Sequence, residues 1–258
     1  MPSLTERYRG PADLPRQIPV FPLLGAILLP RAALRLNVFE PRYLAMVDDA
    51  LAGARVLVIV QPAGSGEGES PPGKAVPLKR VGCAGRLTAY QELEDGRLLI
   101  TLIGIARCTL TDEIETAKLY RLWSASCEPF AQDFVAGAGE RDVDRERLLT
   151  TLGGFLQARQ LKADWSAIGK SPSEALVNAL SVMSPYGPEE KQALLEAPDL
   201  KARAEVLIAL AEMEPGGARQ RLRHDPAVRK DGRWQTQKSR PSERAVSIAA
   251  CSRFSFVR

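Results

Sequence analysis

The sequence of 258 residues predicts an α+β protein, in which a β-rich half precedes a helical half. Three observations lead to this prediction. Short apolar runs rich in Val, Ile and Leu recur over residues 18–130. Apolar residues at helical spacing take over across residues 140–214. The composition, 45% hydrophobic and 26% charged, is that of an ordinary globular chain that can bury a substantial core.

The β-rich half opens with apolar runs that prolines divide. We interpret IPVFPL, AILLP and ALRLNVF, all within residues 18–39, as short kinked strands. Glu40-Pro41-Arg42 then predicts the start of a helix, because proline suits the first helical position and an acid is favourable beside it. This helix is expected to end at Gly53. The next run, RVLVIV over residues 55–60, predicts a buried strand.

Two longer β-rich runs flank Glu94-Asp95-Gly96: CAGRLTAYQEL before it and RLLITLIGIARCTL after it. An Asp-Gly pair between such runs predicts a β-hairpin. We interpret Cys83 and Cys108, which lie in these runs, as small buried hydrophobic residues. A further strand is predicted from YRLWSASC, residues 120–127.

The helical half begins with apolar spacing around Leu148. Ser171-Pro172-Ser173-Glu174 predicts a capping box, in which Ser171 accepts a backbone hydrogen bond and Glu174 reaches back to the backbone. Two more helices are expected, from Pro188 to near Pro198 and from Leu200 to Ala211.

The two ends of the chain differ from its body. Residues 1–17 are polar and contain proline, so we expect a flexible arm. The apolar segment at 18–30 is too short and too rich in proline to span a membrane, and no clean cleavage site follows it. We therefore do not interpret it as a signal peptide.

The helical periodicity stops after Met213. From Pro215 the chain carries 11 Lys and Arg against 3 Asp and Glu, which leaves the preceding residues with a net charge of −4. We expect residues 215–258 to be a basic, disordered tail. Because the break is abrupt, one hypothesis is that this tail arises from a shifted reading frame.

The stretch GESPPGKA, residues 68–75, has the glycine and lysine spacing of a nucleotide-binding phosphate loop. Such a loop needs backbone N–H groups, a following helix, and Ser or Thr after the lysine. Here Pro71 and Pro72 have no N–H, Ala75 follows the lysine, and a strand-like segment comes next. We therefore interpret the stretch as a surface loop.

Other catalytic or metal chemistry lacks support in the sequence. The single histidine, His224, falls in the tail, so no Ser-His-Asp or Cys-His arrangement has a credible base. With one histidine and four widely spaced cysteines, a zinc site is not expected. We predict no catalytic residue, no metal and no cofactor. Widely spaced thiols without a clear export signal indicate a reducing, cytoplasmic location.

Several segments together resemble the N-terminal domain of Lon proteases. Residues 18–60 resemble its opening, and LNVFEPRY is similar to the stand-alone bacterial form. Residues 81–110 resemble its central hairpin, with the sequence VGCAGRLTAYQELEDGRLLITLIGIARCTL. Residues 174–212 resemble its terminal helices, with the sequence EALVNALSVMSPYGPEEKQALLEAPDLKARAEVLIALAE. The resemblance covers residues 18–213. It implies a PUA-like, β-barrel-like subdomain followed by a C-terminal helical bundle.

In full-length Lon proteases this domain helps to recognise and position unfolded substrates, and the ATPase and protease follow it. The chain ends about where these would begin. The resemblance thus implies a non-catalytic polypeptide-binding or adaptor module in bacterial protein quality control. Its partners would be unfolded or hydrophobic polypeptide segments, or a separate Lon protease.

Two alternatives stay open: a nucleic-acid-binding protein, since PUA-like barrels in other families bind RNA, and a hydrolase with an unrecognised site. The acidic body and the lack of a stripe of interleaved aromatic and basic residues argue against nucleic acid.

Four candidate residues lie in VFEPRY. Glu40 and Arg42 are polar groups among apolar neighbours. We interpret them first as structural, with Glu40 favouring the helix N-terminus and Arg42 pairing with an acid or a carbonyl, and a binding role is the alternative. Phe39 and Tyr43 are expected in the core rather than at a contact.

Two further candidates, Arg86 and Tyr90, alternate along GRLTAY. We expect both to be partly exposed and list them as candidates for polypeptide binding.

Overall fold

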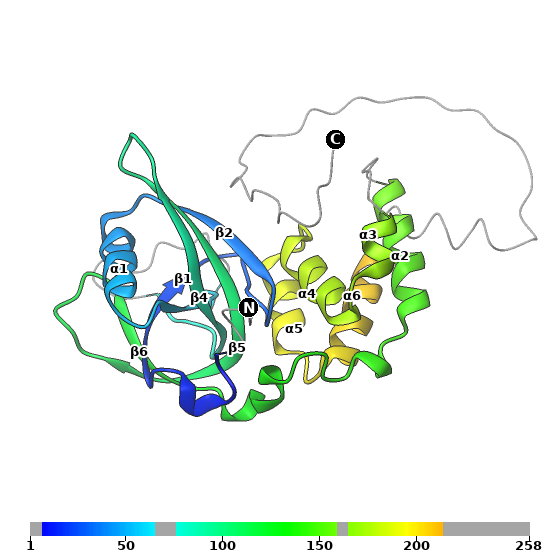
Figure 1. Ribbon diagram of the computed structural model, residues 1–258, viewed down its shortest axis with the longest axis horizontal. Helices are drawn as coiled ribbons and strands as arrows, with labels where there is room; N and C mark the ends of the chain where they lie inside the picture. The colour runs from blue at the N-terminus through cyan, green and yellow to red at the C-terminus, as the bar shows by residue number, and fades with distance from the viewer. Residues whose placement is uncertain (1–6, 65–75, 159–164, 214–258) are drawn as a thin grey trace, which may run out of the picture.

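The computed structural model describes residues 7–64, 76–158 and 165–213. A strongly bent sheet and a group of helices lie side by side (Figure 1). The interpretation of GESPPGKA as a loop and the prediction of a disordered tail concern residues outside these ranges. Within them, no helix combines the length and the apolar character needed to cross a membrane.

The strands form one sheet in the order β2-β5-β4-β3-β1-β6, and β6 also pairs with β5. They are β1 (Gln17–Pro22), β2 (Ala33–Val38), β3 (Val56–Val60), β4 (Val81–Glu92), β5 (Leu98–Ile114) and β6 (Arg121–Ser126). The double pairing is possible because β5 is 17 residues long. Its first half pairs with β2 and its second half with β6. The sheet therefore closes into a barrel-like structure, which confirms the predicted α+β fold class.

One connection in the barrel is parallel. β1 and β3 run parallel, whereas the other paired strands are antiparallel. A parallel pair needs a long crossover, which β2 and helix α1 (Pro41–Ala52) supply. Helix α1 begins where the sequence predicts and packs the ring of Tyr43 against Phe21, with 4.3 Å between the ring centroids. Desolvation in this contact raises the pKa of Tyr43.

The prediction of a strand at AILLP is wrong. This stretch is a buried loop, and its only ladder contact in the described ranges is an isolated bridge between Pro30 and Gly104. The loop lies directly on two glycines of the sheet. A Cβ at Gly104 would overlap the carbonyl of Leu29, and a Cβ at Gly85 would overlap the side chain of Leu28. The apolar residues of the loop fill the core without extending the sheet.

The predicted hairpin and the strand RVLVIV are both confirmed. β4 and β5 pair along their length, and Leu93 donates a 2.9 Å backbone hydrogen bond to Arg97 across the turn. Gly96 takes a positive φ of 79°, which is why the turn favours glycine. All five residues of β3 are buried.

Helices form the second part of the molecule (Figure 1). They are α2 (Arg145–Ala158), α3 (Trp165–Lys170), α4 (Ser173–Met183), α5 (Pro188–Glu196) and α6 (Leu200–Met213). One apolar cluster runs from the outer face of the barrel through Leu57 and Leu102 to Leu176 and Leu207 of these helices. The two parts therefore share a core.

The predicted capping box is wrong. Pro172 is the N-cap of α4, and no side chain caps the helix there. The hydroxyl of Ser171 instead donates to the carbonyl of Ala167 at 2.8 Å, and Glu174 turns towards the barrel. The short helix α3 was not predicted, because six residues are too few to show helical periodicity.

The segment expected to be a flexible arm is packed from Tyr8 onwards. The short 3₁₀ helix η1 (Pro11–Asp13) precedes Leu14, whose side chain is buried in the barrel interior. The Tyr8 hydroxyl accepts a 2.9 Å hydrogen bond from Arg86 of β4. Residues 1–6 lie outside the described ranges.

Helix α5 buries a lysine. The Lys191 ammonium donates to the carbonyl of Val182 at 2.6 Å and makes no ion pair among the described residues. Desolvation lowers the pKa of Lys191 from its ordinary value of 10.5 to about 8.

The buried lysine predicts a pH-dependent stability. Below about pH 8, Lys191 is protonated in both the folded and the unfolded state, so the folded state bears the cost of a buried charge. Between about pH 8 and pH 10.5, Lys191 is neutral in the folded state but still protonated in the unfolded state, so the free energy of unfolding rises with pH. Relative to Lys191→Met, the wild-type chain is expected to gain about 2 kcal/mol between pH 7 and about pH 9.5. Urea denaturation at the two pH values measures this, with the exposed Lys201→Met as control. If the difference in unfolding free energy between the wild type and Lys191→Met did not change with pH, the lowered pKa of Lys191 would be wrong.

Candidate functional site

Three large apolar side chains are exposed at one end of the sheet. Phe39 is 64% exposed, Tyr90 52% and Leu99 41%. They come from the end of β2, from β4 and from β5, which are neighbours in the sheet. Val38 lies opposite Leu98, and Tyr90 lies opposite Ile100. We call this end of the sheet, with Phe39, Tyr90 and Leu99, the hairpin surface.

The hairpin of β4 and β5 projects beyond the other strands of the sheet (Figure 1). Side chains alternate along a strand, so Leu99 faces away from Ile100 and its partner Tyr90. The sheet is thus exposed on both faces at this end. An apolar surface of this kind, formed by a protruding hairpin, is typical of a contact site for another chain.

Strand β2 borders the hairpin surface and has an open edge. Within the described residues β2 pairs with β5 alone. Arg35 and Asn37 on this strand are polar, and a charged side chain such as that of Arg35 discourages edge-to-edge aggregation. The free N–H and C=O groups of an edge strand can pair with an added extended polypeptide.

The structure separates the residues predicted from VFEPRY. Phe39 was expected in the core, and this is wrong: β2 ends at Val38, and the chain leaves the sheet with Phe39 pointing to solvent. Tyr43 is in the core, as expected. Glu40 caps α1 through its backbone and makes no side-chain cap, while its carboxylate pairs with Arg42 at 2.6 Å. Both partners of this pair are exposed.

The other two candidates do not come together. Arg86 is partly buried and donates to Tyr8 and to the carbonyl of Ala54, so its visible role is structural. Tyr90, four residues further along β4, lies on the hairpin surface. Of the six candidates, Phe39 and Tyr90 are therefore the two apolar residues that are exposed.

The sequence reasoning missed a buried ion pair between the barrel and the helices. Arg107 of β5 is 1% exposed, and Asp133 of η2 (Glu128–Phe134) is 7% exposed. The Asp133 carboxylate accepts from the backbone N–H, Nε and Nη2 of Arg107 at 2.8–2.9 Å. The remaining nitrogen of Arg107, Nη1, donates to the carbonyls of Leu195 and Ala197 at the C-terminal end of α5. The guanidinium also lies 4.5 Å from the ring centroid of Phe130.

A second ion pair joins the two parts beside the first. Arg31, in the loop before β2, has a positive φ of 61°, which is unusual for a residue other than glycine. Its guanidinium is paired with Glu174 of α4 and donates to the carbonyl of Asp133 at 2.8 Å. Glu174 also accepts from the backbone of Gly137. In the sequence, the only sign of these two ion pairs was an arginine within each of two apolar runs, Arg31 in one and Arg107 in the other.

The described residues contain no group of three or more His, Cys, Asp or Glu side chains placed to hold a metal ion. At the hairpin turn, Asp95 pairs with Arg97 at the surface. The geometry therefore offers contact surfaces and buried structural pairs within the part of the chain described.

The fold is that of known N-terminal domains of Lon. A Lon N-terminal domain protein from Xanthomonas campestris matches with a TM-score of 0.51 and 22% identity, over 75% of this chain and 97% of that one. The N-terminal domain of the Mycobacterium avium complex Lon protease matches with a TM-score of 0.56 and 19% identity, over 77% and 99%. At these identities the likeness shows the fold.

The family is shown by the sequence itself. Residues 17–212 match the family described as the ATP-dependent protease La (LON) substrate-binding domain, and the chain belongs to that family. It is 24% identical over 216 residues to a Lon protease of Desulfosudis oleivorans, covering 78% of this chain and 25% of that protein. It is 27% identical over 205 residues to Lon protease 2 of Sorangium cellulosum, covering 75% and 24%. The chain thus spans about a quarter of the length of these relatives.

Proposed function

We propose that this protein binds unfolded or hydrophobic polypeptide segments without catalysing a reaction on them. The observation that carries the proposal is the hairpin surface, where Phe39 at the end of β2, Leu99 of β5 and Tyr90 of β4 are exposed at the end of the sheet that β2 borders with its open edge. The description of the family as a substrate-binding domain supports it. A role as adaptor in quality control, alone or beside a separate Lon protease, is part of the same proposal.

The two features suit the same ligand. A segment in extended conformation places its backbone groups along the free edge of β2, which gives affinity that depends little on sequence. Its apolar side chains then contact the exposed Phe39 and Tyr90 rings, which bury large areas with few rotatable bonds. Such a surface selects for exposed apolar side chains and against a folded, polar exterior.

The proposal predicts a loss of binding when the two rings are removed. The double variant Phe39→Ser and Tyr90→Ser is expected to bind a fluorescein-labelled, reduced and carboxymethylated α-lactalbumin about tenfold more weakly, because aromatic anchors carry much of the binding free energy. Fluorescence anisotropy of the labelled chain measures the dissociation constant.

The control is Leu24→Ser, which replaces an exposed apolar residue at the other end of the barrel, beside the end of β3. It should bind like the wild type. Equal affinity of the wild type and the double variant would rule out the hairpin surface as the site. No binding of the unfolded chain by any of the three proteins would rule out the proposed function. A labelled single-stranded RNA in the same assay tests the alternative ligand.

A further inference from the structure

The barrel contains two buried thiols that face each other. Cys108 and Cys127 belong to the apolar cluster inside the barrel, with Val20 and Leu110. Cys83 is also buried, but it belongs to the other cluster, on the face of the sheet that meets the helices. The alternation of side chains along β4 and β5 thus separates Cys83 from the other two thiols.

The strand register brings Cys108 and Cys127 together. Thr109 lies opposite Ser126 and Leu110 opposite Ala125 in the β5–β6 pair. One further step along this ladder places Cys108 opposite Cys127. Directly opposed residues of antiparallel strands have Cβ atoms about 4.5–5.5 Å apart. A disulfide needs about 3.5–4.5 Å, so a small shift of Cys127, just beyond the end of β6, is enough.

The two thiols already interact. A hydrogen bond with the Cys127 side chain, together with desolvation, raises the pKa of Cys108 well above its ordinary value. The proton of this thiol is therefore retained at neutral pH, and Cys108 is the poorer first target for an oxidant.

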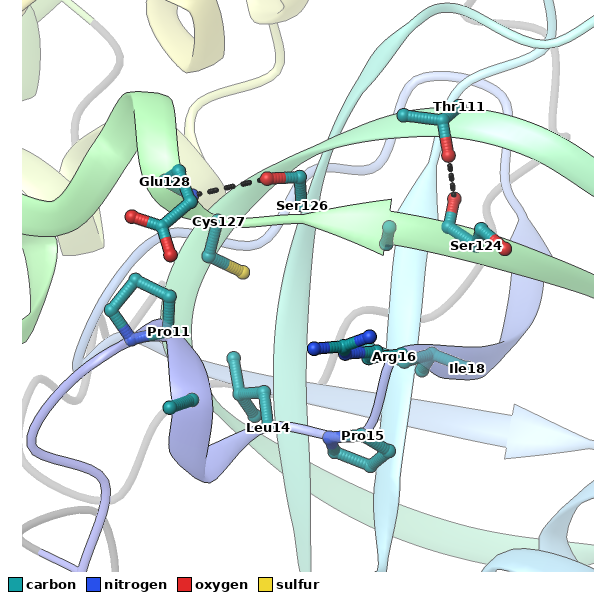
Figure 2. A pocket seen from close by; sticks show the side chains of 12 residues that line it. Pro11, Leu14, Pro15, Arg16, Ile18, Thr111, Ser124, Ser126, Cys127 and Glu128 are labelled. Atoms are coloured by element: carbon teal, nitrogen blue, oxygen red, sulfur yellow. Dashed lines mark hydrogen bonds between the residues drawn. The ribbon is translucent and has the colours of Figure 1, made fainter.

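Cys127 is reached from a cavity at the end of the barrel. The cavity has a volume of about 460 Å³ and lies between the segment Pro11–Ile18 and the end of β6. Figure 2 shows the sulfur of Cys127 among the side chains that line it, with Leu14 and Arg16 from the N-terminal segment. A small polar molecule can therefore approach Cys127 without unfolding the barrel.

We propose that Cys108 and Cys127 form an oxidisable pair that hydrogen peroxide converts into an intrachain disulfide. Peroxide entering the cavity oxidises the Cys127 thiol to a sulfenic acid, and one water leaves. The Cys108 sulfur then attacks the Cys127 sulfur: the S–S bond forms, the S–O bond breaks, and the hydroxyl leaves with the Cys108 proton as a second water. Two thiols and one peroxide thus give one disulfide and two waters.

The disulfide would join β5 to the start of η2, the segment that carries Asp133. Asp133 holds Arg107, which immediately precedes Cys108 on β5. Oxidation therefore adds a covalent link next to the buried ion pair between the barrel and the helices.

The test uses the full chain with Cys251→Ser, which removes the thiol outside the described residues. After treatment with submillimolar hydrogen peroxide, the protein is denatured, alkylated and examined by intact mass and peptide mapping. We expect two of its three thiols to resist alkylation, a cross-linked peptide pair containing Cys108 and Cys127, and complete reversal by dithiothreitol. The matched control Cys83→Ala should form the same link.

Cys127→Ala should leave Cys83 and Cys108 alkylatable, and Cys127→Ser serves the same purpose if the alanine variant does not fold. Circular dichroism checks folding of each variant. Three alkylatable thiols after peroxide treatment, or a link that includes Cys83, would overturn the proposal.

Discussion

Replacing Asp133 with alanine is expected to lower the free energy of unfolding by about 3–5 kcal/mol. The change leaves the Arg107 guanidinium buried between β5 and the helices without its counter-charge. It also removes the acceptor for the backbone N–H of Arg107. Removing one partner of a buried ion pair is costly because the remaining charge is neither paired nor solvated by water.

Urea denaturation, followed by circular dichroism, measures this loss. The control is Asp95→Ala, which breaks an ion pair of similar chemistry at the exposed hairpin turn. There water screens the charges, and the expected change in the free energy of unfolding is much smaller than for Asp133→Ala. If both variants lose the same small amount, Arg107 and Asp133 do not hold the barrel to the helices.

Replacing Gly104 with alanine is the second change with a large expected effect. The added Cβ would overlap the carbonyl of Leu29, which belongs to the backbone of the buried loop before β2. A backbone atom cannot rotate away as a side chain can, so the loop must move off the sheet. We expect a loss of about 3 kcal/mol or failure to fold.

Gly169→Ala is the matched control for Gly104→Ala. A Cβ at Gly169 meets no atom within 4 Å, and the residue lies in α3 with no positive φ. Alanine favours helix over glycine by up to about 1 kcal/mol, so this variant should be as stable as the wild type or slightly more so. The same denaturation series compares the two. If the Gly104→Ala protein were as stable as the wild type, the backbone of the loop at Leu29 would not be in close contact with β5 at Gly104.

Local signals in the sequence predicted much of the fold. The Asp95-Gly96 turn located the hairpin because only a few residue types adopt a positive φ there without strain. The proline at position 41 located the start of α1, because proline favours the first turn and disrupts later ones. Both rules depend on the backbone of neighbouring residues. The same kind of rule failed at Ser171. The capping pattern is present there, but the Glu174 carboxylate forms an ion pair with Arg31 instead of bonding to the backbone at the helix start.

The candidate site was only partly predictable. Tyr90 was expected to be partly exposed and is. Phe39 was expected in the core because it continues an apolar run. However, β2 ends at Val38, one residue before the apolar run ends, and Phe39 is exposed. Where a strand stops depends on how far its partner β5 extends and where α1 packs. Neither is encoded in the few residues around Phe39.

By itself, the sequence determined most strands and helices in their order, the hairpin, the apolar faces and the membership of a family, because these depend on residue type and spacing along the chain. Tertiary structure decided which strands meet: β5 is long enough to pair with both β2 and β6, and this closes the barrel and leaves the edge of β2 open. It also decided that Arg107 meets Asp133 and that Cys108 faces Cys127. Such pairs join residues about 20 to 30 positions apart, and only the packing of the closed sheet brings them within reach of each other.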